Sequence, residues 1–144
     1  MLEIDVPGYK TLRLEHLVLN YNGTLALDGD LLEGVDDALK HLATGLQIHV
    51  LTGDTFGRAR ESLANIPCEL RILPVADQDT GKLQSVQRLD AECCAAFGNG
   101  RNDPLMLQAA ELAIAVLQNE GLAVEAMVAA DVLAPDITTA LALF

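Results

Sequence analysis

Short runs of apolar residues, separated by polar turns, form the main pattern of this chain. One run, Leu17-Val18-Leu19, has polar residues on both sides, and similar runs recur further along the chain. A near-continuous apolar run of this length is typical of a strand buried on both faces, as in a parallel sheet. We expect six such strands, at residues 16–20, 47–51, 69–75, 93–97, 113–117 and 131–133.

The segments between these strands carry helix signals. The apolar residues Val35, Leu39 and Leu42 have helical spacing, for example. Helices are expected at residues 34–43, 56–64, 80–89, 122–130 and 135–144, and from Pro104 onward. A Thr or Asp would cap the third of these, which puts Lys82 in its first turn. Alternating strands and helices predict a three-layer α/β domain with a mostly parallel sheet.

The first fourteen residues differ from the rest because apolar and polar residues alternate there. Alternation at residues 2–6 and 11–14, with Pro7-Gly8 between them, predicts a hairpin that leads into the first buried strand. The chain shows no repeat, low-complexity segment or linker. We therefore expect a single domain spanning residues 1–144, with residues 1–14 as an N-terminal hairpin extension.

Charge limits the classes of partner. The chain has 21 acidic and 9 basic residues, a formal net charge of −12. Such a surface repels nucleic acid and anionic lipid, and also a phosphorylated substrate unless a local cation reverses the field. No apolar run approaches the ~20 residues of a membrane span, and the first residues do not resemble a signal peptide. We expect a cytoplasmic protein without nucleic-acid or membrane partners.

Cysteine and histidine do not point to a metal centre. The three cysteines show no Cys-x-x-Cys spacing, and the three histidines lie on predicted strands and a helix without ligand spacing. We interpret the cysteines as reduced thiols and the histidines as structural. The residues concerned are Cys68, Cys93, Cys94, His16, His41 and His49.

Polar segments follow three of the predicted strands, where open α/β sheets bind ligands. They are Asn20-Tyr21-Asn22-Gly23-Thr24-Leu25, Thr52-Gly53-Asp54-Thr55 and Gly98-Asn99-Gly100-Arg101-Asn102-Asp103. Each alone is weak evidence, because Asn-Gly is common in turns and Thr is a common helix cap. Their order along the chain, together with Lys82, is much more specific.

In that order the three segments and Lys82 resemble the four motifs of the haloacid dehalogenase (HAD) superfamily. The first resembles Asp-x-Asp-Gly-Thr-Leu, and the second has the Thr-Gly-Asp form of P-type ATPases. Lys82 matches the third motif, and the last segment is similar to Gly-Asp-Gly-x-Asn-Asp. The resemblance covers residues 17–133 and is closest to the soluble P-type ATPase-like group. It implies a three-layer HAD-like Rossmannoid domain, a phosphatase-type site and a bound Mg²⁺.

The resemblance also assigns roles to positions of this chain. It implies a nucleophile position, an acid/base position and a Lys that neutralises charge: Asn20, Asn22 and Lys82. It implies a phosphate-binding set: Gly23, Thr52, Gly53 and Lys82. It implies four metal positions: Asn20, Asn22, Asn99 and Asp103.

Three of these positions, often Asp in the family, are Asn here. Asn20 matters most, because an amide oxygen is a poor nucleophile and loss of a nucleophile can cost on the order of 10⁶ in rate. Asn22 is a milder change, and Asn99 removes a second carboxylate, so we expect weak Mg²⁺ binding. A water activated by Asp54 or Asp103 could leave some hydrolysis. The sequence fits a natural amide at Asn20 as well as one introduced to disable the site.

Only about thirty residues separate Asn20 from Thr52, so we expect no cap domain and an open site. Two functions compete. One is a HAD-like phosphohydrolase, impaired by Asn20, that acts on a phosphomonoester. The other is a catalytically inactive relative that binds an anion or a protein partner. In both, the ligand is a phosphate-bearing small molecule or protein. A vestigial pocket is a third interpretation, and a receiver domain is disfavoured because it lacks these turns.

Overall fold

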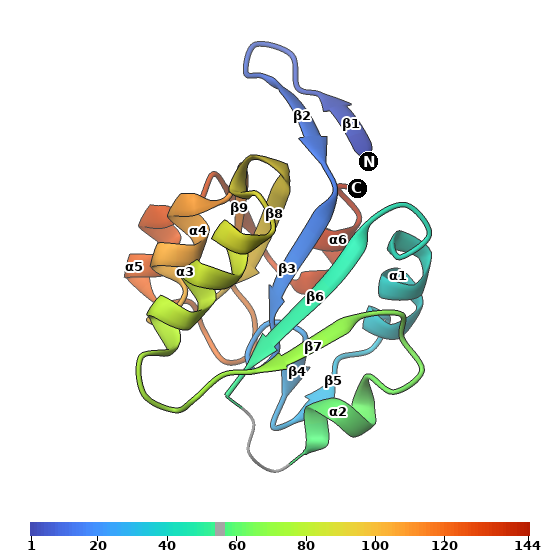
Figure 1. Cartoon of the computed structure of the whole chain (residues 1–144), viewed down its shortest axis with the longest axis vertical. Helices are drawn as coiled ribbons and strands as arrows, with labels where there is room; N and C mark the ends of the chain where they lie inside the picture. Colours follow the sequence, from blue (N-terminus) through green and yellow to red (C-terminus); the bar gives the residue numbers. More distant parts are fainter. Residues whose placement is uncertain (54–56) are drawn as a thin grey trace.

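The computed structural model describes residues 1–53 and 57–144. Six parallel strands in these ranges form one sheet, in the order β10-β9-β8-β3-β6-β7 (Figure 1). In chain order they are β3 (His16–Asn20), β6 (Gln47–Thr52), β7 (Glu69–Ile72), β8 (Cys94–Gly98), β9 (Leu112–Val116) and β10 (Val132–Ala134). The α/β class and the parallel sheet are therefore confirmed.

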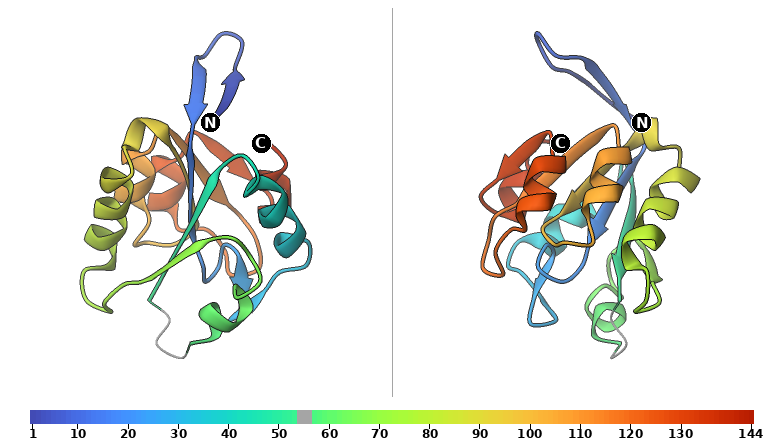
Figure 2. Two further views of the ribbon diagram at one scale, coloured as in Figure 1. Left: turned by 45° about the vertical axis from the view of Figure 1, so that its right-hand side comes forward. Right: turned by 90° about the vertical axis from the view of Figure 1, so that its left-hand side faces the viewer.

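Helices cover both faces of this sheet, so the molecule has three layers (Figures 1 and 2). On one face are α1 (Val35–Leu42), α2 (Arg58–Ser62) and α6 (Ile137–Leu141). On the other are α3 (Gln78–Arg88), α4 (Pro104–Ala109) and α5 (Val124–Ala129). Alternate residues of β3 enter the two cores: Leu17 and Leu19 pack in the first, and Val18 in the second. This double burial explains why the strand is apolar throughout.

Two small hairpins lie outside the main sheet. The predicted N-terminal hairpin is present as β1 (Leu2–Asp5) and β2 (Thr11–Leu14), and it projects from one end of the molecule (Figure 2). The second, β4 (Ala26–Leu27) and β5 (Asp30–Leu31), was not predicted. Its turn at Asp28 and Gly29 has positive φ, and the buried Tyr21 donates a hydrogen bond to the Gly29 carbonyl oxygen. Between β3 and β6 the described chain holds only this hairpin and α1, so no cap domain is inserted there.

The prediction that placed Lys82 in the first turn of its helix is wrong. Helix α3 begins at Gln78, two residues before the predicted start, and Lys82 lies in its second turn. The preceding residue, Asp77, has a left-handed backbone (φ 57°) and makes no side-chain cap. The start of the helix expected at residues 56–64 falls outside the described residues. No helix in the described ranges has the length and apolarity to cross a membrane.

Candidate functional site

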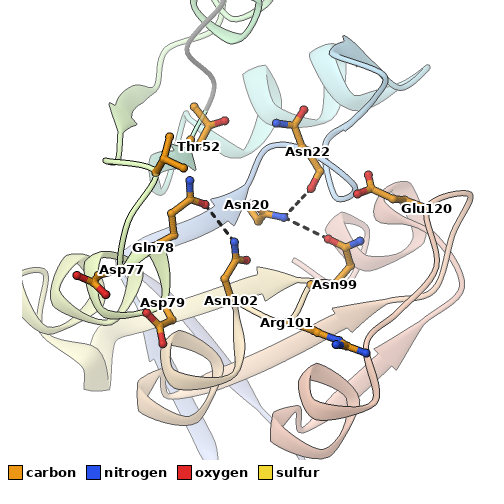
Figure 3. Close-up of a pocket in the computed structure, with 13 residues that line it drawn as sticks. Asn20, Asn22, Thr52, Asp77, Gln78, Asp79, Asn99, Arg101, Asn102 and Glu120 are labelled. Atoms are coloured by element: carbon orange, nitrogen blue, oxygen red, sulfur yellow. Dashed lines mark hydrogen bonds between the residues drawn. The ribbon is translucent and has the colours of Figure 1, made fainter.

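The C-terminal ends of β3, β6 and β8 meet at one edge of the sheet, as parallel strands require. A cavity of about 710 Å³ opens there. Among the residues that line it are five of the predicted site: Asn20, Asn22, Thr52, Gly53 and Asn99 (Figure 3). The structure therefore brings together side chains that are almost eighty residues apart in the sequence.

Asn20 lies at the floor of the cavity, and both ends of its carboxamide are engaged. Its Oδ1 accepts a hydrogen bond from Lys82 Nζ at 3.1 Å. Its Nδ2 donates to the main-chain oxygen of Asn22 at 2.7 Å and to Asn99 Oδ1 at 3.2 Å. An ammonium group only donates and a main-chain carbonyl only accepts, so these partners fix which end is oxygen. Asn20 thus acts as a hydrogen-bonding hub.

Lys82 is buried beneath this hub and paired with Asp103. Its Nζ lies 2.6 Å from Asp103 Oδ1, and the two side chains are 1% and 0% exposed. The other hydrogen bonds of the ammonium go to Asn20 Oδ1 and, at 2.8 Å, to Asn102 Oδ1. An ammonium has three N–H donors, so three internal acceptors satisfy Lys82 completely.

Both carboxylate oxygens of Asp103 also accept hydrogen bonds within the protein. While its Oδ1 pairs with Lys82, its Oδ2 accepts the backbone N–H groups of Asn99 at 2.9 Å and Gly100 at 2.8 Å. These bonds fold the segment after β8 into a tight loop. An oxygen that holds two N–H groups is not free to activate a water, so the geometry does not support the expected use of Asp103. The other candidate for that role, Asp54, lies outside the described residues.

The loop after β3 packs closely against Asn99 and Glu120 at Gly23. Gly23 has a φ of 79°, and a Cβ there would lie 2.6 Å from Glu120 Oε2 and 2.8 Å from Asn99 Oδ1. Only glycine fits that conformation and spacing. The Gln118 side chain donates to the main-chain oxygens of Gly23 and Thr24 at 2.9 and 2.6 Å, which ties the loop to the segment after β9.

The charged groups of the cavity lie at its rim. Three are carboxylates, Asp77, Asp79 and Glu120, and one is the cation Arg101. Across the part of the chain that the structure describes, Arg101 and Glu120 have neither an ion pair nor a hydrogen bond. Since Lys82 and Asp103 neutralise each other, the rim carries the net charge that a ligand would meet.

No protein-family model and no curated protein sequence matches this chain. Solved structures do. A 3-deoxy-D-manno-octulosonate 8-phosphate phosphatase from Moraxella catarrhalis, in complex with magnesium, phosphate and KDO, matches with a TM-score of 0.75 at 13% identity, over 90% of this chain and 84% of that one. A phosphoserine phosphatase from T. onnurineus gives 0.68 at 13%, over 91% and 94%. This chain has the HAD fold. A zinc-transporting PIB-type ATPase also matches, with a TM-score of 0.64 at 25% identity, over 78% of this chain and 18% of that one.

The fold brings three of the four predicted motifs to the cavity wall, and the fourth, Lys82, lies buried beneath Asn20. Asn20 ends β3 in the interior of the sheet, Thr52 ends the neighbouring β6, and the loop from Asn99 follows β8 on the other side. Lys82 reaches the same point from α3 on one face of the sheet. The geometry brings these segments close together, and the chemical roles of their residues stay predictions.

The four predicted metal positions of this HAD fold do not fit Mg²⁺. Three supply amides, and the fourth, Asp103, has both oxygens engaged by Lys82 and backbone N–H groups. Asn20 and Asn99 also share a direct hydrogen bond, so Asn99 Oδ1 already accepts a donor within the protein. Mg²⁺ gives up its water reluctantly and is usually held by carboxylates. No group of three or more acidic, His or Cys side chains suited to a metal occurs among the described residues.

Sequence reasoning missed several residues that line the cavity, and two of them, Gln78 and Glu120, lie beside the predicted site residues. Gln78 comes from the first turn of α3, and Glu120 from the loop after β9. Neither belongs to a motif, and both positions depend on how distant loops pack. Gln78 reaches the cavity because α3 begins two residues earlier than the sequence predicted.

Proposed function

We propose that this chain is a HAD-type phosphohydrolase relative whose catalysis is impaired by Asn20 and which binds a phosphate-bearing ligand. The observation that carries this proposal is the engagement of Asn20. Its oxygen accepts from Lys82 and its nitrogen donates to Asn22 and Asn99, and among the described residues no carboxylate occupies its position. The group at the nucleophile position therefore stabilises the site and does not attack phosphorus.

Donors at the cavity support an oxygen-rich anionic ligand. Thr52 and Gly53 line the wall at the end of β6, and Arg101 lines the cavity with no internal partner among the described residues. Asn102 Nδ2 is a further donor on the opposite wall. Phosphate is held in proteins mainly by hydroxyl, backbone N–H and guanidinium groups of this kind. The phosphate complex of the Moraxella enzyme supports the same ligand class.

The carboxylates at the rim lower the affinity of the cavity for an anion. Asp77, Asp79 and Glu120 oppose an anion, and only Arg101 attracts it among the charged residues described at the rim. We therefore expect binding of phosphate that weakens as the pocket's net charge becomes more negative, without a requirement for Mg²⁺. The likeness to the PIB-type ATPase supports the soluble P-type ATPase-like subgroup as part of this proposal.

Two assays test the proposal. One measures hydrolysis of para-nitrophenyl phosphate with Mg²⁺ by the unaltered chain, by Asn20→Asp and by Asn20→Asp/Asn99→Asp. The other measures the shift in melting temperature that inorganic phosphate causes in the presence of EDTA. We expect no turnover by the unaltered chain and a phosphate-dependent rise in its melting temperature. Asn65→Asp, at an exposed position that does not line the cavity, controls for the added charge.

The outcomes separate the parts of the proposal. Turnover by the double variant alone would show that both amides disable the site together, as their mutual hydrogen bond suggests. Turnover by the unaltered chain would contradict the impairment, and Glu120, a carboxylate without an internal partner in the described structure, would be the group to replace next. The absence of any phosphate-dependent stabilisation would contradict the ligand class.

A further inference from the structure

Gln78 crosses the cavity between its two walls (Figure 3). At one end, its Nε2 lies over Gly53, and a Cβ on Gly53 would stand 2.9 Å from Gln78 Cδ. At the other end, Gln78 Oε1 accepts a hydrogen bond from Asn102 Nδ2 at 3.1 Å. The carboxamide thus spans from the end of β6 to the loop after β8.

The orientation of Asn102 shows what Gln78 satisfies. Asn102 Oδ1 accepts from Lys82 Nζ, which can only donate. Its Nδ2 is therefore directed away from Lys82, toward the cavity, where it presents a donor. Gln78 Oε1 takes that donor. A ligand oxygen at the same place would accept the same hydrogen bond.

We propose that Gln78 is a specificity-determining residue, whose carboxamide stands in for a ligand oxygen and must be displaced when an anionic ligand binds. This inference rests on the proposed phosphate-binding function. A phosphate oxygen replaces Gln78 Oε1 as acceptor for Asn102, and it gains the space beside Gly53. A ligand group that only donates cannot make this exchange, so the displacement selects acceptor-rich anions.

The need to displace Gln78 also lowers the affinity of the site for phosphate. A ligand that binds only when Gln78 has moved away has its affinity reduced by the fraction of molecules in that state. Gln78 is held by one described side-chain hydrogen bond, and a typical net value for one bond corresponds to a factor of roughly five in affinity. Removing the side chain should therefore tighten binding of phosphate.

Two substitutions at this position give opposite expectations. Gln78 is the first residue of α3, so Gln78→Ala keeps a good helix former, and Gln78→Glu places an acidic residue where a helix N-terminus favours it. Gln78→Ala should bind inorganic phosphate roughly fivefold more tightly. Gln78→Glu should bind it more weakly than the unaltered chain, because it adds a fixed negative charge beside Gly53.

The test is isothermal titration of the full chain with inorganic phosphate in EDTA, with circular dichroism to confirm folding. Gln87→Ala and Gln87→Glu, at an exposed position of the same helix, are the matched controls and should leave affinity unchanged. Weaker binding in both Gln78 variants would show that the side chain supports the ligand and would overturn the inference. Unchanged affinity in Gln78→Ala would also overturn it.

The inference and the proposed function fail in different ways. If the unaltered chain binds phosphate and Gln78→Ala does not improve it, only the role of Gln78 is wrong. If neither the unaltered chain nor Gln78→Ala binds phosphate, the proposed function is wrong, and the role of Gln78 falls with it. Binding by Gln78→Ala alone would show that Gln78 excludes phosphate and is not displaced by it, which would contradict both the inference and phosphate binding by the unaltered chain.

Discussion

Amide side chains give the site a hydrogen-bond network in which every direction is set by a neighbour. Asn99 Nδ2 donates to the Gly121 carbonyl at 3.2 Å, so its Oδ1 must face Asn20. Asn20 therefore has to present a donor there, which an ionised Asp does not have. Asn20→Asp alone would set a carboxylate oxygen against Asn99 Oδ1, whereas the double variant also supplies the second carboxylate that Mg²⁺ usually requires.

The Lys82–Asp103 pair should show strong coupling in stability. Lys82→Met leaves a fully buried carboxylate without its cation and should cost about 3–5 kcal/mol in the free energy of unfolding. Adding Asp103→Asn should recover part of that loss. Urea unfolding of both single variants and the double variant gives the coupling energy.

A surface pair provides the control for this measurement. Lys40 and Asp36, one helical turn apart on α1, are 41% and 52% exposed, and their coupling should be about 0.3–0.5 kcal/mol. Additive effects of Lys82→Met and Asp103→Asn would contradict the buried pairing. They would also weaken the argument that Lys82 is satisfied within the protein.

At the scale of elements, a histidine pair joins β3 to β6. His16 Nδ1 and His49 Nε2 are 3.1 Å apart, and both side chains are buried. One ring nitrogen must be an unprotonated acceptor for this bond to form. Glu69 Oε2 lies 3.5 Å from His49 Nδ1, and its negative charge raises the pKa of His49. The positive charge of Arg71, on the same strand, lowers that pKa. Burial, with help from His16, lowers the pKa of His49 below 6.5.

This pair predicts a loss of stability in mild acid. The unfolded chain binds a proton at His49 more readily than the folded one, so stability should fall as the pH drops below 6.5. Urea unfolding across about pH 5 to 8 measures how the free energy of unfolding depends on pH. His49→Gln should flatten the curve, whereas His41→Gln, on the exposed side of α1, should not. Equal pH dependence in all three proteins would contradict the assignment.

The sequence predicted the strands whose residue types are determined by burial on both faces of the sheet. Strand β3 is apolar on both faces because helices cover both faces, and that requirement is visible in Leu17-Val18-Leu19. The hairpin β4–β5 has two residues in each strand, too few for any periodicity, and it depends on Tyr21 reaching Gly29. Glu120 could not be placed either, because its position follows from loop packing around Gly23.

At the scale of the whole molecule, charge is far from balanced. With a net charge of −12, the excess acidic groups repel one another in the compact state. Salt screens this repulsion, with a screening length of about 10 Å at 0.1 M. We expect the melting temperature to rise between about 0.01 M and 1 M NaCl. Glu33→Gln should reduce that rise and Arg88→Gln should increase it, since each removes one exposed charge. A melting temperature that falls with salt would mean that ion pairs outweigh the repulsion.

The tight loops of the site have a consequence for chemical ageing. Asn followed by Gly is prone to lose ammonia when the glycine nitrogen attacks the side-chain carbonyl carbon, and Asn22-Gly23 and Asn99-Gly100 both have this sequence. Here the Gly23 N–H donates to the Ala26 carbonyl, and the Gly100 N–H donates to Asp103. Neither nitrogen is free to attack while the loops are formed. Folding thus protects these two amides from conversion to aspartate or isoaspartate over the lifetime of the protein.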